Sequence, residues 1–381
     1  MEEVNELVKI FVQIFEKENT VTVNKREIEK NIVKDGDNFS SGILRLKIEY
    51  TDGMQNLYKN VFLKIPTISA NYNFTSNLVI FDREIYMYEV VLPRMYELWN
   101  EITFSPKFYA ATKLKSLILE DLSESGFKTQ DKKIKLDLNH SKIALRSLAQ
   151  FHALSLKYLQ TYGTDEIKLG SPYDIPNQGE TQNEMREFLI SLYNKFLEVS
   201  STTVSEKIYQ TLNKTYKNCI IEQASSIIKP NEEGLNVIRH GDCWTNNILF
   251  LHDDEGNVLE CKMIDFQLSC IGSPIIDLIY FFITSVQFDV YEKYEEEFFD
   301  IYLNSLNDTL LILRVDKTYT RNDLNNDIEK YKTFYIFVIG ITLQFITSNE
   351  TQILNIMNVT SQQYISLVQK WLNYLDRKNL L

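Results

Sequence analysis

The sequence has few cysteines, no long apolar run and no basic start, the features that mark zinc or disulfide-bonded, membrane-spanning and secreted proteins. Its 381 residues include four cysteines and no Cys-x-x-Cys pair, so we expect neither a zinc site nor a disulfide framework. The longest apolar run, residues 334–346, is too short to cross a bilayer, is interrupted by Gly340 and Gln344, and is predicted to be a buried helix. The first residues are acidic and lack the basic start of a signal peptide. We therefore expect a cytoplasmic protein without a membrane partner.

Positive charge is also in short supply. The formal net charge is −12, and a nucleic-acid backbone binds basic surfaces, so nucleic acid is not expected as a partner. The sequence shows no internal repeat and no feature that requires a protein partner. Its length and its 44% hydrophobic content are sufficient for a large core and for two lobes.

The stretch richest in candidate functional residues is 238–277. A short polar loop holds Asp242 and Asn247, a hairpin turn is predicted at 253–256, and Asp265 follows an apolar stretch predicted to be a strand. Phosphoryl transfer uses such a set: one carboxylate orients the acceptor hydroxyl and takes its proton, and a carboxylate and an amide oxygen hold Mg²⁺ against the phosphates of ATP. A single Asp is usually a cap or a surface group, so the ordered combination is what favours catalysis.

A lysine and a glutamate in the first third of the chain extend this set. Lys64 ends a predicted strand, 57–65, and a lysine flanked by apolar residues is costly to bury without a partner. Glu84 lies beside the apolar stripe of a helix predicted over 77–99. We predict a Lys64–Glu84 pair that also serves the α- and β-phosphates of ATP. The alternative is an exposed lysine at a strand end.

Two further segments are candidate nucleotide contacts. Residues 34–42 form a loop of mostly small and polar residues between predicted strands, and such a loop can lay backbone N–H groups over phosphates. With two glycines, it is equally consistent with a plain hairpin. The end of the strand predicted at 116–120 is a candidate adenine contact by position alone, or else a polar linker. The predicted nucleotide-binding residues in these two segments are Gly36, Asp37, Asn38, Phe39, Ser40, Ser41, Glu120, Asp121 and Leu122.

The rest of the chain, 123–381, is predicted to be mainly helical, after an N-terminal part, 1–122, built on strands. His152, on a strongly apolar helix, is expected to be buried and hydrogen-bonded rather than catalytic. Asp277 opens a buried helix, and we expect it to cap that helix and to brace the catalytic loop. Residues 315–327 are predicted to be a polar loop.

Taken in order, these motifs resemble the ecdysteroid-kinase-like family, which is similar to choline kinases and aminoglycoside phosphotransferases and shares the protein-kinase-like fold. The match runs from about residue 30 to 300, and its most specific parts are Trp244 and the sequence Asp265-Phe266-Gln267. The other motifs are Phe62-Leu63-Lys64, Glu84 with Tyr88, Leu119-Glu120-Asp121-Leu122, Leu148-Ala149-Gln150-Phe151-His152, His240-Gly241-Asp242, and Asp277-Leu278.

The resemblance implies an α+β, two-lobed fold, with a mainly antiparallel five-stranded sheet and a helix first and a mainly α-helical lobe second. It also implies ATP-dependent phosphorylation of a small-molecule hydroxyl, which in ecdysteroid kinases is a steroid alcohol. By position, Asp242 is the expected catalytic base, Asn247 and Asp265 are the expected Mg²⁺ ligands, and Lys64 with its partner Glu84 is expected to hold the phosphates.

Two departures from protein kinases favour a small-molecule acceptor. Gly241 replaces the arginine that reads a phosphorylated activation loop, and only twelve positions separate Asp265 from Asp277, which leaves no space for a peptide platform. A choline-type kinase and an inactive kinase-like binding protein are the alternatives. A third interpretation, a nucleophile at Cys243 near His240, lacks an orienting acid and an oxyanion site.

Overall fold

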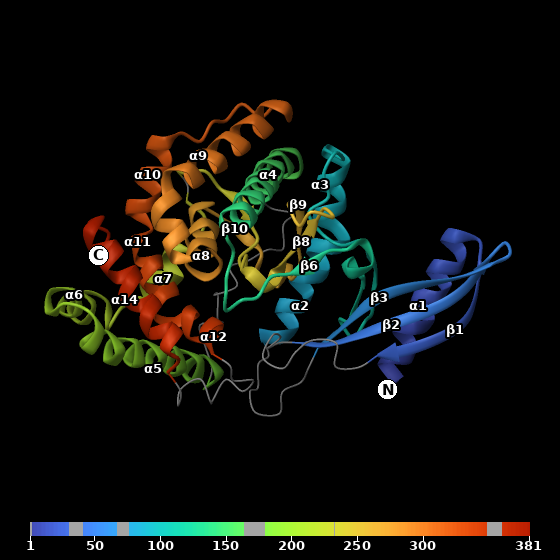
Figure 1. The fold of residues 1–381 in the computed structure, drawn as a ribbon, viewed down its shortest axis with the longest axis horizontal. Helices are drawn as coiled ribbons and strands as arrows, with labels where there is room; N and C mark the ends of the chain where they lie inside the picture. The colour runs from blue at the N-terminus through green and yellow to red at the C-terminus, as the bar shows by residue number, and fades with distance from the viewer. Residues whose placement is uncertain (1, 30–40, 67–75, 164–179, 232, 349–359) are drawn as a thin grey trace.

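The computed structural model describes residues 2–29, 41–66, 76–163, 180–231, 233–348 and 360–381. An antiparallel sheet with one helix on it lies at one end of the molecule, and most of the helices lie at the other (Figure 1). The predicted α+β class, with a five-stranded sheet followed by a mainly helical part, is confirmed. Within the described part of the chain, no helix has the length and apolarity needed to span a bilayer.

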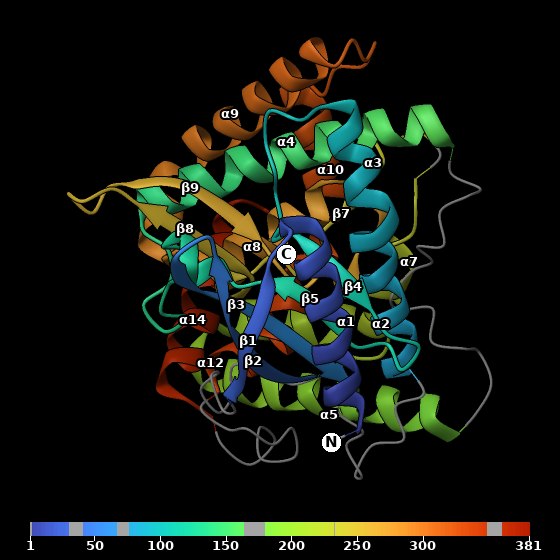
Figure 2. The ribbon, with the colours of Figure 1, turned by 90° about the vertical axis from the view of Figure 1, so that its right-hand side faces the viewer.

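The five-stranded sheet has the order β1-β2-β3-β5-β4, and every neighbouring pair is antiparallel. Helix α1 (Glu2–Asn19) lies across it (Figure 2), and its apolar side chains, such as Phe11, pack with Leu46 and Leu63 of the sheet in a small core. Alternation along the strands places these residues on one face. The strands are β1 (Thr22–Glu29), β2 (Ser41–Asp52), β3 (Gln55–Pro66), β4 (Phe108–Ala111) and β5 (Leu117–Glu120).

The helix predicted at 77–99 is present and contains one π turn. It consists of α2 (Ser76–Tyr86), η1 (Met87–Val91) and α3 (Leu92–Leu98). Pro93, near the start of α3, has no N–H to donate, and the preceding Leu92 N–H bonds the carbonyl of Met87, five residues back. The π turn thus lies directly before a residue whose missing N–H removes one rung of the α-helical ladder.

The helical part packs around a large apolar core that also takes in Tyr88 and Leu119 from the first 122 residues. The expected domain boundary at 122 therefore stays a prediction. The elements are α4 (Leu138–Tyr162), α5 (Glu180–Thr203), α6 (Glu206–Thr211), η3 (Leu212–Tyr216), α7 (Ile220–Ile227), α8 (Ile275–Ser285), α9 (Phe288–Ile312), α10 (Arg321–Lys330), α11 (Lys332–Phe337), η6 (Val338–Thr342), α12 (Leu343–Thr347) and α14 (Gln362–Arg377).

Helix α10 corrects one prediction. Residues 315–327 were expected to be a loop, but α10 begins at Arg321. A capping box starts it: the Thr320 hydroxyl accepts from the N–H of Asp323, and the Asp323 carboxylate accepts from the N–H of Thr320. The buried helix predicted around 334–346 is confirmed by α11, η6 and α12.

Short strands carry the candidate catalytic segment. β7 (Val237–Arg239) pairs with β10 (Cys270–Gly272), and β8 (Ile248–His252) pairs with β9 (Val258–Met263) and with β6 (Lys128–Thr129). The hairpin turn predicted between β8 and β9 is confirmed. Three short 3₁₀ turns complete the elements: η2 (Leu122–Ser125), η4 (Thr245–Asn247) and η5 (Phe266–Leu268).

Candidate active site

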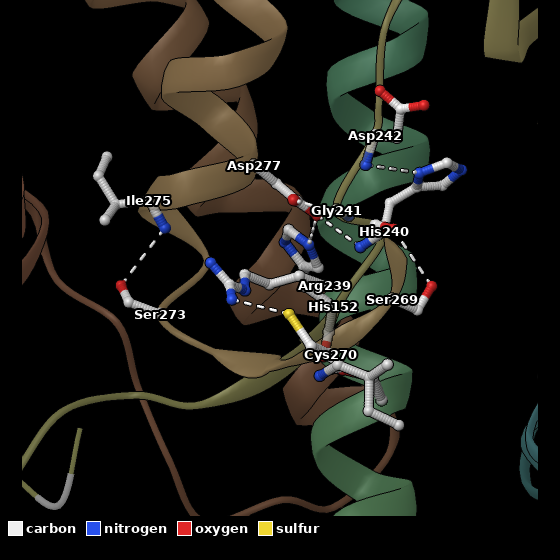
Figure 3. Close-up of polar contacts among 12 residues, drawn as sticks. His152, Arg239, His240, Gly241, Asp242, Ser269, Cys270, Ser273, Ile275 and Asp277 are labelled. Atoms are coloured by element: carbon white, nitrogen blue, oxygen red, sulfur yellow. Dashed lines mark hydrogen bonds and ion pairs between the residues drawn. The ribbon is translucent and has the colours of Figure 1, made fainter. Parts of the chain in front are cut away.

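Asp277, a buried residue in the first turn of α8, holds the backbone of the loop that follows β7. Its carboxylate accepts hydrogen bonds from the backbone N–H of His240 at 2.7 Å and of Gly241 at 3.0 Å (Figure 3). The N-cap of α8 is Pro274, so the prediction that Asp277 caps the helix was wrong, whereas the prediction that it braces the loop is confirmed.

His152 completes this bracing. Its Nε2 lies 3.1 Å from Asp277 Oδ2 and its Nδ1 lies 2.8 Å from the hydroxyl of Tyr302, all in the interior. Burial alone would raise the pKa of Asp277, but the hydrogen bond and charge of His152 outweigh it and lower that pKa below its ordinary value. His152 is thus buried and hydrogen-bonded, as expected.

Gly241 and His240 fix the path of the loop. Gly241 has a φ of +84°, and a Cβ there would lie 2.2 Å from the carbonyl oxygen of Leu268, so only glycine fits. His240 Nε2 lies 3.0 Å from the carbonyl oxygen of Ile264, which makes Nε2 the protonated nitrogen. Burial lowers the pKa of His240, and its Nδ1 accepts from the N–H of Asp242. A neutral histidine therefore links the loop to the residue before Asp265.

Asp242 is held through both carboxylate oxygens. Oδ1 accepts from the hydroxyl of Tyr280 at 2.5 Å, and Oδ2 accepts from Nδ2 of Asn247 at 3.0 Å. Burial, aided by the nearby charge of Asp265, raises the pKa of Asp242 to about 7. A carboxylate with a pKa near neutrality is well matched to accept a proton from an alcohol during a transfer reaction near neutral pH.

Lys64 joins the sheet to the end of β9. Its Nζ lies 2.8 Å from the Glu84 carboxylate and 2.9 Å from Asp265 Oδ1. Burial alone would lower the pKa of Lys64, but the charges of Asp265 and Glu84 outweigh it and raise that pKa, so the lysine is charged. The predicted Lys64–Glu84 pair is confirmed, and the direct contact with Asp265 is an addition that the sequence did not reveal.

A backbone hydrogen bond brings the segments that carry Asn247 and Asp265 side by side. The backbone carbonyl of Asn247 accepts from the N–H of Ile264 at 2.9 Å, which brings Asp265 alongside, and Asp265 has a left-handed backbone with φ of +67°. Nδ2 of Asn247 donates to Asp242, so the side-chain amide oxygen Oδ1 of Asn247 is the atom that can coordinate an ion. Among the described residues, no three His, Cys, Asp or Glu side chains form a metal site by themselves.

This donor set fits Mg²⁺. The ion prefers oxygen ligands and is usually held by one or two protein groups together with phosphate and water oxygens. One carboxylate and one amide oxygen are what Asp265 and Asn247 offer. The assignment of these two residues as Mg²⁺ ligands stays a prediction that the geometry accommodates.

The predicted adenine contacts lie where the sheet passes into the helical part. Asp121 is buried, and its carboxylate accepts from Nε of Arg45 at 2.7 Å and from the N–H of Ser123 at 3.0 Å, so this side chain ties the linker to the sheet. The role of Glu120, Asp121 and Leu122 toward adenine stays a prediction. Of the predicted phosphate loop, Ser41 begins β2, and Gly36, Asp37, Asn38, Phe39 and Ser40 lie outside the described residues.

Two residues outside the predicted site residues, Cys243 and Tyr280, also lie at the site. Cys243 is buried, and burial raises the pKa of its thiol well above the ordinary value, which agrees with setting aside a nucleophile at this position. Tyr280, which contacts the candidate base, was missed. Its position three residues after Asp277, on the same face of a helix, was the available signal.

Residues 35–315 match the ecdysteroid kinase-like family, which is well over half of the chain. The chain belongs to the ecdysteroid kinase-like family. This confirms the resemblance inferred from the motifs, and membership of the family supports a kinase-like phosphotransferase that acts on a small molecule. Among solved structures, a choline/ethanolamine kinase family protein from Mesorhizobium loti is 11% identical, with a TM-score of 0.40, over 90% of this chain and 92% of that one. No curated protein sequence matches the chain.

Proposed function

We propose that this member of the ecdysteroid kinase-like family transfers the γ-phosphoryl group of ATP to a hydroxyl of a small molecule, using Mg²⁺. The observation that carries the proposal is one continuous cluster. Lys64 bridges Glu84 and Asp265. Asn247 bonds the candidate base Asp242 through its side chain and bonds the N–H of Ile264, the residue before Asp265, through its backbone carbonyl. This is the set of charges and oxygen ligands that phosphoryl transfer requires.

Each residue has a role in the reaction. The Lys64 ammonium binds oxygens of the α- and β-phosphates, and Glu84 keeps that ammonium in place. Asn247 and Asp265 would hold Mg²⁺, which would neutralise charge on the phosphates. Asp242 orients the acceptor hydroxyl. As the hydroxyl oxygen bonds to the γ-phosphorus, the bond to the leaving ADP oxygen breaks, and the hydroxyl proton passes to Asp242.

We favour an ecdysteroid-like steroid or another apolar alcohol as the acceptor, on the support of the family alone. Such an acceptor needs a wide apolar cleft, whereas the cation of choline needs an aromatic and acidic cage. An inactive kinase-like binding protein is the alternative of another class. All the catalytic positions of the set are filled, which supports an enzyme.

The test is phosphate transfer from γ-labelled Mg-ATP to a panel of ecdysteroids, other hydroxylated apolar compounds, choline and ethanolamine. We expect transfer to an apolar alcohol, and we expect Asp242→Asn to lower turnover by several orders of magnitude while calorimetry shows that Mg-ATP still binds. Asp254→Asn, which removes the same charge from an exposed turn, is the matched control and should leave turnover unchanged.

Two results would count against the proposal. Binding of Mg-ATP by the wild type without transfer to any compound of the panel would favour the inactive binding protein. Unchanged turnover in Asp242→Asn would remove Asp242 from its role as base.

A further inference from the structure

Helix α8 reaches the catalytic loop at two points, one turn apart. Asp277 holds the backbone N–H groups of His240 and Gly241, and Tyr280 donates its hydroxyl to Oδ1 of Asp242 at 2.5 Å. Residues three apart lie on the same face of a helix, so both contacts come from one surface of α8. One contact fixes the main chain of the loop, and the other fixes the side chain of the candidate base.

The second contact matters because it determines how the Asp242 carboxylate is turned. The Asn247 amide holds Oδ2 at 3.0 Å, and with the Tyr280 hydroxyl on Oδ1 the plane of the carboxylate is fixed at both oxygens. Each oxygen can accept more than one hydrogen bond, so a substrate hydroxyl can still be received. With Asn247 alone, the carboxylate would be held at one oxygen and could turn about its side-chain bonds.

We infer that Tyr280 is a positioning residue that orients the catalytic carboxylate of Asp242 toward the acceptor hydroxyl. The inference rests on the proposed function. Tyr280 is half-buried on α8, and its backbone carbonyl accepts from the hydroxyl of Thr284 at 2.7 Å. The ring is therefore expected to stay in place when only its hydroxyl is removed.

The experiment compares Tyr280→Phe with Tyr193→Phe, a control on α5 that also loses one tyrosine hydroxyl hydrogen bond, to the carbonyl oxygen of Leu212. ADP release from Mg-ATP is measured with an ecdysteroid and with water alone as the acceptor. We expect Tyr280→Phe to lower kcat about 10- to 100-fold in both assays, with the KM for ATP within about twofold of the wild type. Tyr193→Phe should stay within about twofold in both parameters.

A crystal structure of Tyr280→Phe provides a readout that does not depend on activity. We expect the Asp242 carboxylate to leave its single orientation and the distance from Oδ2 to Asn247 Nδ2 to change. An unmoved carboxylate would overturn the inference, as would a kcat within twofold of the wild type or an equal loss in Tyr193→Phe. A wild-type protein that transfers phosphate to nothing would refute the proposed function instead, and the crystal structure would still decide whether Tyr280 holds Asp242.

Discussion

Replacing Asp277 by Asn tests how the catalytic loop is held. The change keeps the shape of the side chain and removes its charge. In the wild type, Oδ2 accepts from the N–H of His240 and from His152, and Oδ1 accepts from the N–H of Gly241. An asparagine has one carbonyl oxygen. If that oxygen takes the place of Oδ2, the NH₂ group meets the N–H of Gly241, and two donors face each other.

The expected loss follows from these contacts. Two hydrogen bonds remain but lose their ionic partner, at about 1 kcal/mol each, and a buried N–H left without an acceptor costs about 1–3 kcal/mol. We therefore expect the free energy of unfolding to fall by about 3–5 kcal/mol at pH 7. Because the folded protein lowers the pKa of Asp277, this contribution is present above about pH 4 and is lost as the pH falls through the folded pKa.

The assay is urea unfolding of wild type and Asp277→Asn at pH 7 and at a pH well below 4, where the lowered pKa of Asp277 is crossed. The control is Asp289→Asn, which breaks an exposed ion pair with Lys370 and should cost less than about 1 kcal/mol. The difference between wild type and Asp277→Asn should be smaller at the lower pH. A free energy of unfolding within 1 kcal/mol of the wild type at pH 7 would refute the view that Asp277 braces the loop.

Three further changes have defined outcomes. Lys64→Met should lower turnover about 100- to 1,000-fold, measured as ADP release, because the charge between Glu84 and Asp265 is lost; a loss below tenfold would contradict its role. Gly241→Ala should unfold at a clearly lower urea concentration than Gly256→Ala, since both have φ of +84° but only the first places a Cβ against the backbone; equal midpoints would contradict the clash. Burial lowers the pKa of Lys135 to about 7, so the folded state disfavours its proton and wild-type stability should rise with pH between about 7 and 10.5, by up to roughly 5 kcal/mol. In urea unfolding, the free energy of unfolding of Lys135→Met should therefore exceed that of the wild type by more at pH 6.5 than at pH 9. An equal difference at both pH values would refute this.

Much of the site could be predicted because the patterns that form it are local. Alternation of apolar residues defines the strand that carries Lys64 near its end, and a buried lysine requires a carboxylate, which the helix carrying Glu84 supplies. The polar turn between β8 and β9 likewise indicates the hairpin that separates Asn247 from Asp265. These inferences need only the chain direction and the period of the elements.

The contacts that were missed join residues far apart in the chain. Lys64 and Asp265 are 201 residues apart, and Tyr280 and Asp242 are 38 apart, so their approach depends on how the sheet, the loop and α8 pack together. Helix α10 was missed for a different reason. Its ten residues are nearly all polar, and only Leu324 and Asp327 are buried, which leaves almost no apolar period to detect.

The central claim is that Asn247 and Asp265 converge on one divalent ion beneath the phosphates of ATP. It is tested most directly by anomalous diffraction from crystals grown with Mn²⁺ and a non-hydrolysable ATP analogue. We predict one peak about 2.0–2.3 Å from Asn247 Oδ1 and from a carboxylate oxygen of Asp265, with Lys64 on the phosphates. A peak ligated by other residues, or an analogue bound with its phosphates away from Lys64, would contradict the account.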